Sequence, residues 1–323
     1  MFQAIISGKN GFYVTRALIG LLEGGFICDT CLWISYFFTS KEYTNRMCYF
    51  YASNQITTII SSLLAFALLK IKTSALGDGW RWLFLIEGAF TLIIGIASWF
   101  LMPASPVQTK AWYRPNGWYT EREEKIVVNK VLRDDPNKGD MNNRQPVTLK
   151  ELFKSFFDYD LFPVYFIRFL IELSSSPVSA YLQLSLRQLG FSTFKTNALS
   201  IPNSILNLFT MFLFSYLSEV LNSRSLLFAF NALWCISTLI PMRYWSGSGK
   251  QEHAWGTFAL LTVLLGHPSM TALSTSWVSA NSNSVKTRAV STAVVNMFSQ
   301  ADSIVGANIY RMMHHYITVV IPN

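Results

Sequence analysis

The stretch 15-TRALIGLLEGGFICDTCLWISYF-37 has the length and apolar content of a membrane-spanning helix. It also contains Arg16, Glu23 and Asp29, and ionised groups are costly in hydrocarbon. Such groups usually face the interior of a helix bundle or a water-filled path. The stretch therefore predicts one helix of a polytopic membrane protein, with charged residues facing inward.

The composition of the whole chain agrees with a membrane protein. Of the 323 residues, 51% are hydrophobic and only 14% are charged, whereas soluble domains carry about 25% charged residues. The formal net charge is +8, but the Lys and Arg residues lie between apolar runs, so no nucleic-acid partner is expected. The four cysteines lie inside apolar runs and do not predict a disulfide framework.

Eight apolar runs of roughly 20 residues follow one another along the chain. Backbone amides in lipid must be satisfied internally, and the runs are too long for barrel strands, so each run is predicted to be a helix. The predicted fold class is all-α, in the membrane. The runs cover residues 11–38, 47–69, 82–102, 161–186, 197–217, 225–242, 254–277 and 289–309.

A long polar segment, 104–160, separates the first three runs from the other five. Within it, Thr120 with Glu123 and Thr148 with Glu151 form two capping boxes, each followed by helical spacing of apolar residues. The second of these helices is amphipathic and lies either in the headgroup layer or against the first. The distribution of basic residues predicts that the segment is cytoplasmic.

Four passages carry a family resemblance. They are 16-RALIGLLEGGFI-27, 79-GWRWLFLIEGAFTLIIGIASWFLMPASP-106, 117-GWYTEREEKIVVNKVLRDDPNKGDMNNRQ-145 and 288-RAVSTAVVNMFSQADSIVGANIYR-311. Together they resemble the allantoate permease family, fungal anion:cation symporters of the major facilitator superfamily. The resemblance implies a plasma-membrane transporter, not an enzyme, that needs no cofactor and moves small organic anions of the allantoate or carboxylate type with protons.

The resemblance also implies a partial fold. Family members have twelve helices with a long cytoplasmic loop after the sixth, so the eight runs here match helices four to eleven. Residues 1–103 would then be three helices of the N-terminal half, 104–160 the loop, and 161–311 five helices of the C-terminal half. Residues 312–323 read MMHHYITVVIPN, and a one-base shift of codons that could encode them gives DDAPLYHRGN. This tail is therefore predicted to be out of frame.

The first run carries the first candidate residues. Arg16, Gly20 and Gly24 follow one another at four-residue steps, so they share one stripe of a helix. Glycines at this spacing permit close helix packing, and the resemblance implies that Arg16 organises the transport path or attracts an anion. Glu23 is the candidate proton-coupled carboxylate. The alternative for Arg16 is a structural ion pair with a neighbouring helix.

Further candidates for the transport path lie in the second half of the chain. Arg168 and Glu172 are four residues apart and can pair on one helix face. The pair is either a variant substrate site or drift in a chain that is no longer under selection. His267, next to Pro268, either titrates near neutral pH or is simply hydrogen-bonded.

The last run carries a series of polar residues. Asn296 and Gln300 share a helix face, which favours hydrogen bonds that pack helices together, and Asp302 is a candidate for the ion path. The adjacent histidines His314 and His315 do not share a helix face and have no thiol or carboxylate nearby. No metal site is therefore predicted.

A second functional hypothesis is that this chain transports nothing. A path that lacks one of its walls cannot alternate between two open states, and the chain would then be an inactive fragment or a non-transporting membrane partner. In that case the lipid bilayer remains its environment, and the endoplasmic reticulum becomes an expected location for misfolded chains. The sequence does not identify the transported solute, the coupling ion or the oligomeric state.

Overall fold

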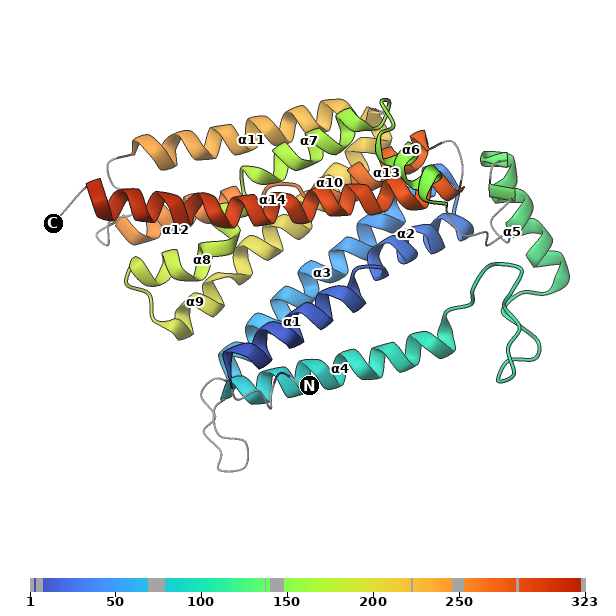
Figure 1. Cartoon of the computed structure of the whole chain (residues 1–323), viewed down its shortest axis with the longest axis horizontal. Coiled ribbons are helices and arrows are strands. Elements are labelled where there is room, and N and C mark those ends of the chain that lie inside the picture. The colour runs from blue at the N-terminus through green and yellow to red at the C-terminus, as the bar shows by residue number, and fades with distance from the viewer. Residues whose placement is uncertain are drawn as a thin grey trace.

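The computed structural model describes residues 3, 8–68, 79–136, 138–139, 148–221, 223–245, 253–282 and 285–320. Within these ranges the regular structure is helical, and the one isolated bridge joins Ala111 to Arg114. The all-α prediction is confirmed for this part of the chain. Most of the long helices run roughly along the long axis of the molecule, whereas α5 lies at one end and runs across that axis (Figure 1).

The first three predicted runs form four helices in the structure. These are α1 (Lys9–Glu23), α2 (Phe26–Phe37), α3 (Ser40–Leu68) and α4 (Gly79–Leu101). The run predicted as one helix over 11–38 is interrupted at Gly24 and Gly25, where α1 ends and α2 begins. In Figure 1 these four helices lie on the lower side of the molecule, with α4 at the edge.

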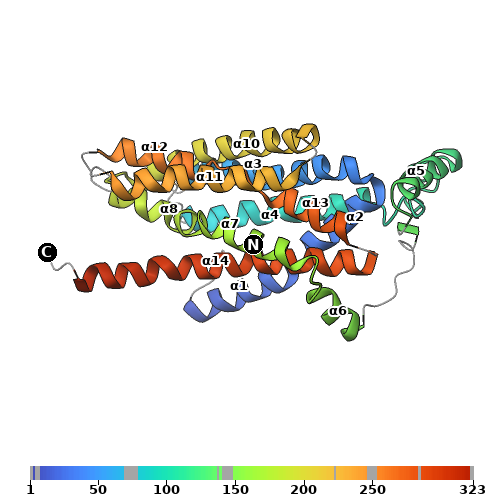
Figure 2. The ribbon, with the colours of Figure 1, turned by 90° about the horizontal axis from the view of Figure 1, so that it is seen from above.

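Two helices form within the polar segment, as predicted. α5 (Glu121–Asp134) begins with the expected capping box: Glu123 Oε2 accepts from Thr120 N at 2.9 Å, and Thr120 Oγ1 accepts from Glu123 N at 3.5 Å. α6 (Leu149–Phe156) packs against α14, whereas α5 packs against α2. In Figure 2, α5 lies beyond one end of the bundle and α6 lies beside α14, so the two linker helices contact different parts of the bundle.

The second part of the chain forms the remaining helices. They are α7 (Phe162–Leu173), α8 (Ser176–Gln188), α9 (Thr193–Leu199), α10 (Ile201–Leu221), α11 (Arg224–Tyr244), α12 (Ala254–Leu265), α13 (Thr271–Asn281) and α14 (Val285–Val320). Two predicted runs are each broken into a helix pair, α7 with α8 and α12 with α13. Each break lies next to a proline, Pro177 or Pro268, which has no amide hydrogen to continue a helix.

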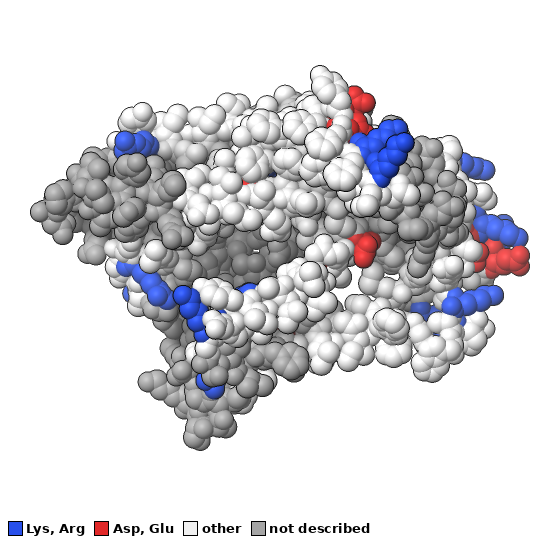
Figure 3. Space-filling model, in the orientation of Figure 1, with Lys and Arg blue, Asp and Glu red and all other residues white. Residues whose placement is uncertain are grey.

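Four helical segments of the described chain are long and apolar enough to cross a membrane by length and composition. They are Lys9–Phe37, Gly79–Leu101, Lys195–Leu221 and Arg224–Tyr244. The other four predicted runs coincide with α3, with the two broken helix pairs and with α14. The count of eight spans therefore stays a prediction. On the face in Figure 3, charged side chains gather mostly towards the two ends of the molecule.

Helix α3 connects the first helices to the second part of the molecule. It packs against α10 and α13, and its buried Met47 and Cys48 share one apolar cluster with Met211 and Ala272. The outward face of α4 is apolar and open, and Trp99 on it is 78% exposed. Such a face suits a lipid environment, since exposed patches of this kind mark membrane contact.

Candidate transport site

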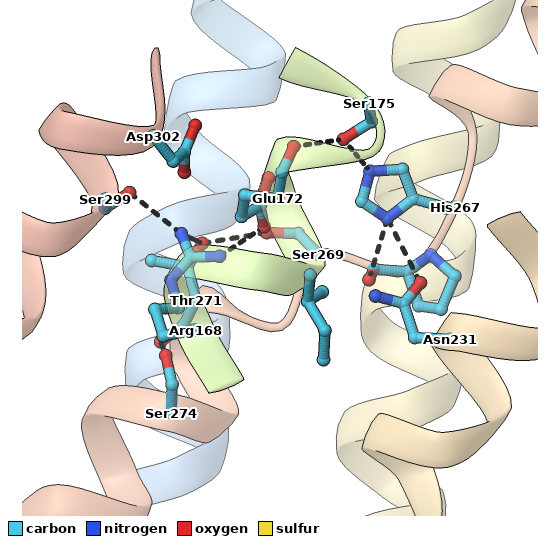
Figure 4. A network of polar contacts seen from close by, with 12 residues as sticks. Arg168, Glu172, Ser175, Asn231, His267, Ser269, Thr271, Ser274, Ser299 and Asp302 are labelled. Carbon is cyan, nitrogen blue, oxygen red and sulfur yellow. Dashed lines mark hydrogen bonds and ion pairs between the residues drawn. The ribbon is translucent and has the colours of Figure 1, made fainter. Parts of the chain in front are cut away.

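The two broken helix pairs meet at one point in the molecule. Ser175 lies between α7 and α8, His267 lies between α12 and α13, and Ser175 Oγ is 2.9 Å from His267 Nε2 (Figure 4). Non-helical backbone at membrane depth is tolerated only where protein or a water-filled cavity surrounds it. Discontinuous helices of this kind often form the solute sites of membrane transporters.

Side chains of α10 satisfy the backbone of the second break. Asn207 Nδ2 donates to His267 O at 2.7 Å, and Thr210 Oγ1 donates to Gly266 O at 2.9 Å. A Cβ atom built on Gly266 would lie 2.3 Å from Leu206 Cδ2, so α10 approaches the break closely. Hydrogen bonds and close packing from α10 therefore stabilise this break.

The contacts of His267 define its neutral tautomer. The residue is 5% exposed, and Nδ1 lies 3.2 Å from Asn231 Oδ1 and 3.3 Å from Pro268 O. A backbone carbonyl only accepts hydrogen bonds, so Nδ1 carries the hydrogen. In the neutral ring Nε2 then accepts from the hydroxyl of Ser175. A protonated ring would instead donate from Nε2, and the hydroxyl of Ser175 could turn to Glu172 O, which lies 3.2 Å away.

Arg168 joins three helices next to the breaks. Its guanidinium forms an ion pair with Glu172 on α7, and Nη2 donates to Thr271 Oγ1 at 2.8 Å and to Ser299 Oγ at 3.0 Å. The Arg168 side chain is 3% exposed and that of Glu172 is 20% exposed. The predicted pairing of Arg168 with Glu172 is therefore present, and α13 and α14 hold the cation as well (Figure 4).

A polar cavity of about 420 Å³ lies beside this ion pair. It is bounded by α3 on one side and by helices of the second part on the others. Its lining includes Gln55, Glu172, Asn203, Asn207, His267 and Asp302. Three of the six predicted path residues, Glu172, His267 and Asp302, thus share one cavity, and Arg168 contacts Glu172 directly. Their role in transport stays a prediction.

Two predicted path residues lie elsewhere. Arg16 and Glu23 are exposed on α1, which packs against α2, and neither lines the cavity. The guanidinium of Arg16 lies 5.3 Å from the centre of the Phe12 ring. Asp29 is also exposed, in the first turn of α2. Helical spacing predicts which residues share a stripe but not what faces that stripe, so the path roles of Arg16 and Glu23 stay predictions.

The residues predicted for helix packing show few of the expected contacts. A Cβ atom on Gly20 would meet nothing within 4 Å, and one on Gly24 would meet only carbonyl oxygens of its own helix. Asn296 is half-buried and Gln300 is exposed. Among the hydrogen bonds of the described residues, none joins either amide to another helix. Close packing at these four positions therefore stays a prediction.

Several residues of the site were not singled out from the sequence. Ser175, Asn203, Asn207 and Asn231 lie in apolar runs and have no obvious motif. A usable signal is the run 174-SSSP-177, where three serines precede a proline inside a predicted span and mark a break in the helix. Among the described residues, no group of three His, Cys, Asp or Glu side chains could hold a metal.

Comparisons of the amino-acid sequence with known proteins identify one family. The family model described as Major Facilitator Superfamily matches residues 2–307. Uncharacterized transporter YIL166C of Saccharomyces cerevisiae is 38% identical over 96% of this chain and 57% of its own length. Major facilitator-type transporter hxnP of Emericella nidulans is 24% identical over 90% of this chain and 56% of its own length.

A third relative has a substrate in its name. The "Putative tartrate transporter" of Agrobacterium vitis is 28% identical over 42% of this chain and 29% of its own length. No solved structure matches the chain. The chain spans little more than half the length of the first two relatives. Its family match over residues 2–307 and its apolar helices identify a membrane protein, and the chain belongs to the Major Facilitator Superfamily, a family of transporters and not of enzymes.

Proposed function

We propose that the chain acts as a transporter of the allantoate permease type, which moves small organic anions with protons through the cavity between α3 and the second part. The observation that carries this proposal is the buried Arg168, whose charge is neutralised by Glu172 at the edge of a cavity that also contains Asp302. Buried charged groups in membrane helices usually mark substrate or ion pathways.

The ion pair offers a physical link between proton binding and anion binding. While Glu172 is ionised, its carboxylate competes with a solute carboxylate for Arg168. A proton on Glu172 removes this competitor, so Arg168 can pair with the solute. Proton binding alone leaves Arg168 unpaired, and anion binding alone leaves one carboxylate unpaired. Because an unpaired buried charge is unfavourable, the proton and the anion bind together. Asp302, on the same cavity, is a second proton acceptor.

The relative from Agrobacterium vitis supports an organic anion as the solute, since tartrate is a dicarboxylate.

Residues 312–323, which are predicted to be an out-of-frame tail, lie outside the residues whose side chains the structure describes. The proposed location is the plasma membrane, and the lipid bilayer covers the apolar face of α4. The coupling ion is the proton, and it acts at Glu172 and Asp302.

The exposure of Arg16 and Glu23 on α1 favours a second candidate function. Two charged residues on an open face of an apolar helix are costly in lipid, so another membrane protein would cover them. In this second case the chain is a non-transporting partner, and the cavity carries no solute.

Uptake into proteoliposomes tests the two functions. The purified chain is compared with a fusion to the segment of YIL166C that lies outside the match, using radiolabelled tartrate, succinate and succinamate. We expect uptake to rise as pH falls, and Glu172→Gln should weaken this pH dependence while Asp302 remains as the second proton acceptor. Glu121→Gln, on the exposed loop helix, is the matched control. Uptake by the fusion alone would support the non-transporting candidate, and pH-independent uptake would contradict proton coupling.

A further inference from the structure

A second polar cavity, of about 1020 Å³, lies where α3 and α11 begin and α10 ends. Five of its lining residues carry a hydroxyl group, four are charged, and none of them lines the first cavity. Its wall includes Glu42, which pairs with Lys130 of α5. The cavity therefore lies at the end of the bundle where α5 docks, which is the side that the sequence predicts to be cytoplasmic.

Both carboxylates of this cavity already have donors. Glu42 Oε1 is 2.7 Å from Lys130 Nζ, and Glu219 Oε1 accepts from Asn45 Nδ2 at 2.7 Å. An ionised carboxylate needs hydrogen-bond donors or a cation when it leaves bulk water. These contacts supply them, so neither carboxylate depends on the cations that line the cavity.

The two cations of the cavity have no carboxylate partner. Arg224 is half-buried, and its Nη1 donates to Ser276 O at 3.3 Å. Lys41 is exposed, and neither side chain forms an ion pair with another residue that the structure describes. A guanidinium has five N–H donors, and a neutral carbonyl does not balance its charge. The cavity thus offers two positive charges and several hydroxyl donors to an anion.

The surroundings of the cavity suit the headgroup layer of a membrane. Two candidate spans, Lys195–Leu221 and Arg224–Tyr244, meet here at their ends. Beside the lining residues in sequence, Val220, Leu221 and Leu226 are 62%, 45% and 46% exposed. These apolar side chains can contact acyl chains while the cavity holds a headgroup. Basic pockets between membrane helices on the cytoplasmic side bind anionic lipid headgroups.

We propose that this cavity binds the phosphate group of an anionic phospholipid, with Lys41 and Arg224 as its two cations. Hydrogen bonds from Arg or Lys to phosphate are charge-assisted, and Arg can donate two in parallel. Lys41 lies on α3 and Arg224 on α11, so one phosphate held by both links the first helices to the second part of the chain. The site is separate from the proposed transport cavity and does not depend on its role.

Titration of lipids into the full chain in detergent, followed by native mass spectrometry, tests this site. The probe is dioleoylphosphatidic acid. Dioleoylphosphatidylcholine has the same acyl chains but no net charge, and inorganic phosphate has the same chemical group without acyl chains. We expect phosphatidic acid to bind at least about 10-fold more tightly than phosphatidylcholine, as one charge-assisted hydrogen bond allows. Inorganic phosphate at the same concentration should not displace it.

Two variants examine the cations separately. Arg224→Gln should weaken the binding of phosphatidic acid about 10-fold, through the loss of a charge-assisted hydrogen bond. Lys41→Gln should weaken it by about 3-fold, because water screens an exposed charge. Lys41 is exposed and has no ion pair among the described residues, so this variant keeps the test decisive if Arg224→Gln does not fold. Thermal unfolding in the same detergent checks that each variant is folded.

Arg243→Gln is the matched control, because Arg243 lies in the last turn of the same helix and does not line the cavity. It should leave the binding of phosphatidic acid unchanged. Equal binding of the two lipids, binding that Lys41→Gln does not weaken, or an equal loss in Arg243→Gln would overturn the site. Inorganic phosphate that displaces the lipid at equal concentration would overturn the lipid as the source of the phosphate group.

Discussion

Arg288 Nη2 donates to Asp135 Oδ2 at 2.6 Å, which ties the end of the loop helix α5 to the start of α14. Arg288 Nε also donates to Ser279 O at 3.1 Å. The neighbouring Asp134 accepts from the backbone N and the hydroxyl of Ser40, both at 2.7 Å, at the start of α3. Two adjacent carboxylates therefore connect α3 and α14 through one helix, and we name this arrangement the α5 clamp.

The first prediction concerns Arg288 in the α5 clamp. The side chains of Arg288 and Asp135 are 6% and 15% exposed, and removing one partner of a buried pair costs about 3 kcal/mol. Arg288→Gln should therefore increase hydrogen exchange across residues 121–135 and lower the midpoint of thermal unfolding in detergent. Lys125→Gln, which breaks an exposed pair with Glu121, is the control. Unchanged exchange in the Arg288 variant would contradict a clamp.

The second prediction concerns acid and the pair between Lys130 and Glu42, which are 2.7 Å apart. The hydrogen bond from Lys130 lowers the pKa of Glu42 below its ordinary value. The pair therefore stabilises the docked α5 at pH values above the pKa of the unfolded state, and this effect is lost as pH falls through the lower folded pKa. Since the pair is largely exposed, it contributes below about 1 kcal/mol.

Glu42→Gln provides the measurement for this second prediction. Hydrogen exchange of α5 should be faster in the variant than in the wild type at pH 7, after correction for the intrinsic exchange rate. The difference should shrink as pH falls through the lowered pKa of Glu42, because the carboxylate of the wild type then becomes protonated as well. A difference that persists in acid would mean that the contact does not depend on the charge of Glu42.

Local sequence patterns predicted some features of this protein correctly. The capping box at Thr120 and the pair of Arg168 with Glu172 depend on residues three or four apart, so helical spacing alone predicts them. The contact of Ser175 with His267 joins residues 92 positions apart. No periodicity within one run reports such a contact, because it depends on two helix breaks meeting in space.

Helical spacing within one run also fails to predict that two candidate residues lie apart from the cavity. Because ionised groups are costly in lipid, the sequence favours an inward position for Arg16 and Glu23. The structure shows both of them exposed on α1, and the spacing of residues within α1 does not predict what faces them. Composition predicts that such a helix needs a polar environment, but only tertiary packing decides where that environment is.

The third prediction compares two glycines in helix interiors. A Cβ atom on Gly306 would lie 2.6 Å from Ser176 Oγ and 3.2 Å from Pro177 N, so α14 and α8 have no room for it. Gly306→Ala should lower the free energy of unfolding by about 1–3 kcal/mol. Gly95→Ala, where nothing lies within 4 Å, should leave stability unchanged or raise it by up to about 1 kcal/mol. Thermal unfolding in one detergent distinguishes them, and equal effects would contradict close packing of α14 on α8.

The fourth prediction is a double-mutant cycle on Arg168 and Glu172. Arg168→Met leaves a carboxylate without its cation, and Glu172→Gln leaves a cation that is 3% exposed without its anion. Each single change should destabilise the protein, by about 3 kcal/mol. The double variant contains neither charge, so its loss should be smaller than the sum of the two single losses by about 1–3 kcal/mol.

The exposed pair of Lys125 with Glu121 is the matched control for this cycle, because it has the same four-residue spacing on a helix and side chains that are 69% and 85% exposed. Its coupling should not exceed about 0.5 kcal/mol, since water screens both charges. Chemical unfolding in detergent at pH 7 measures both cycles. If the two couplings were equal, Arg168 and Glu172 would be hydrated like a surface pair, and proton binding at Glu172 could not control whether Arg168 accepts an anion.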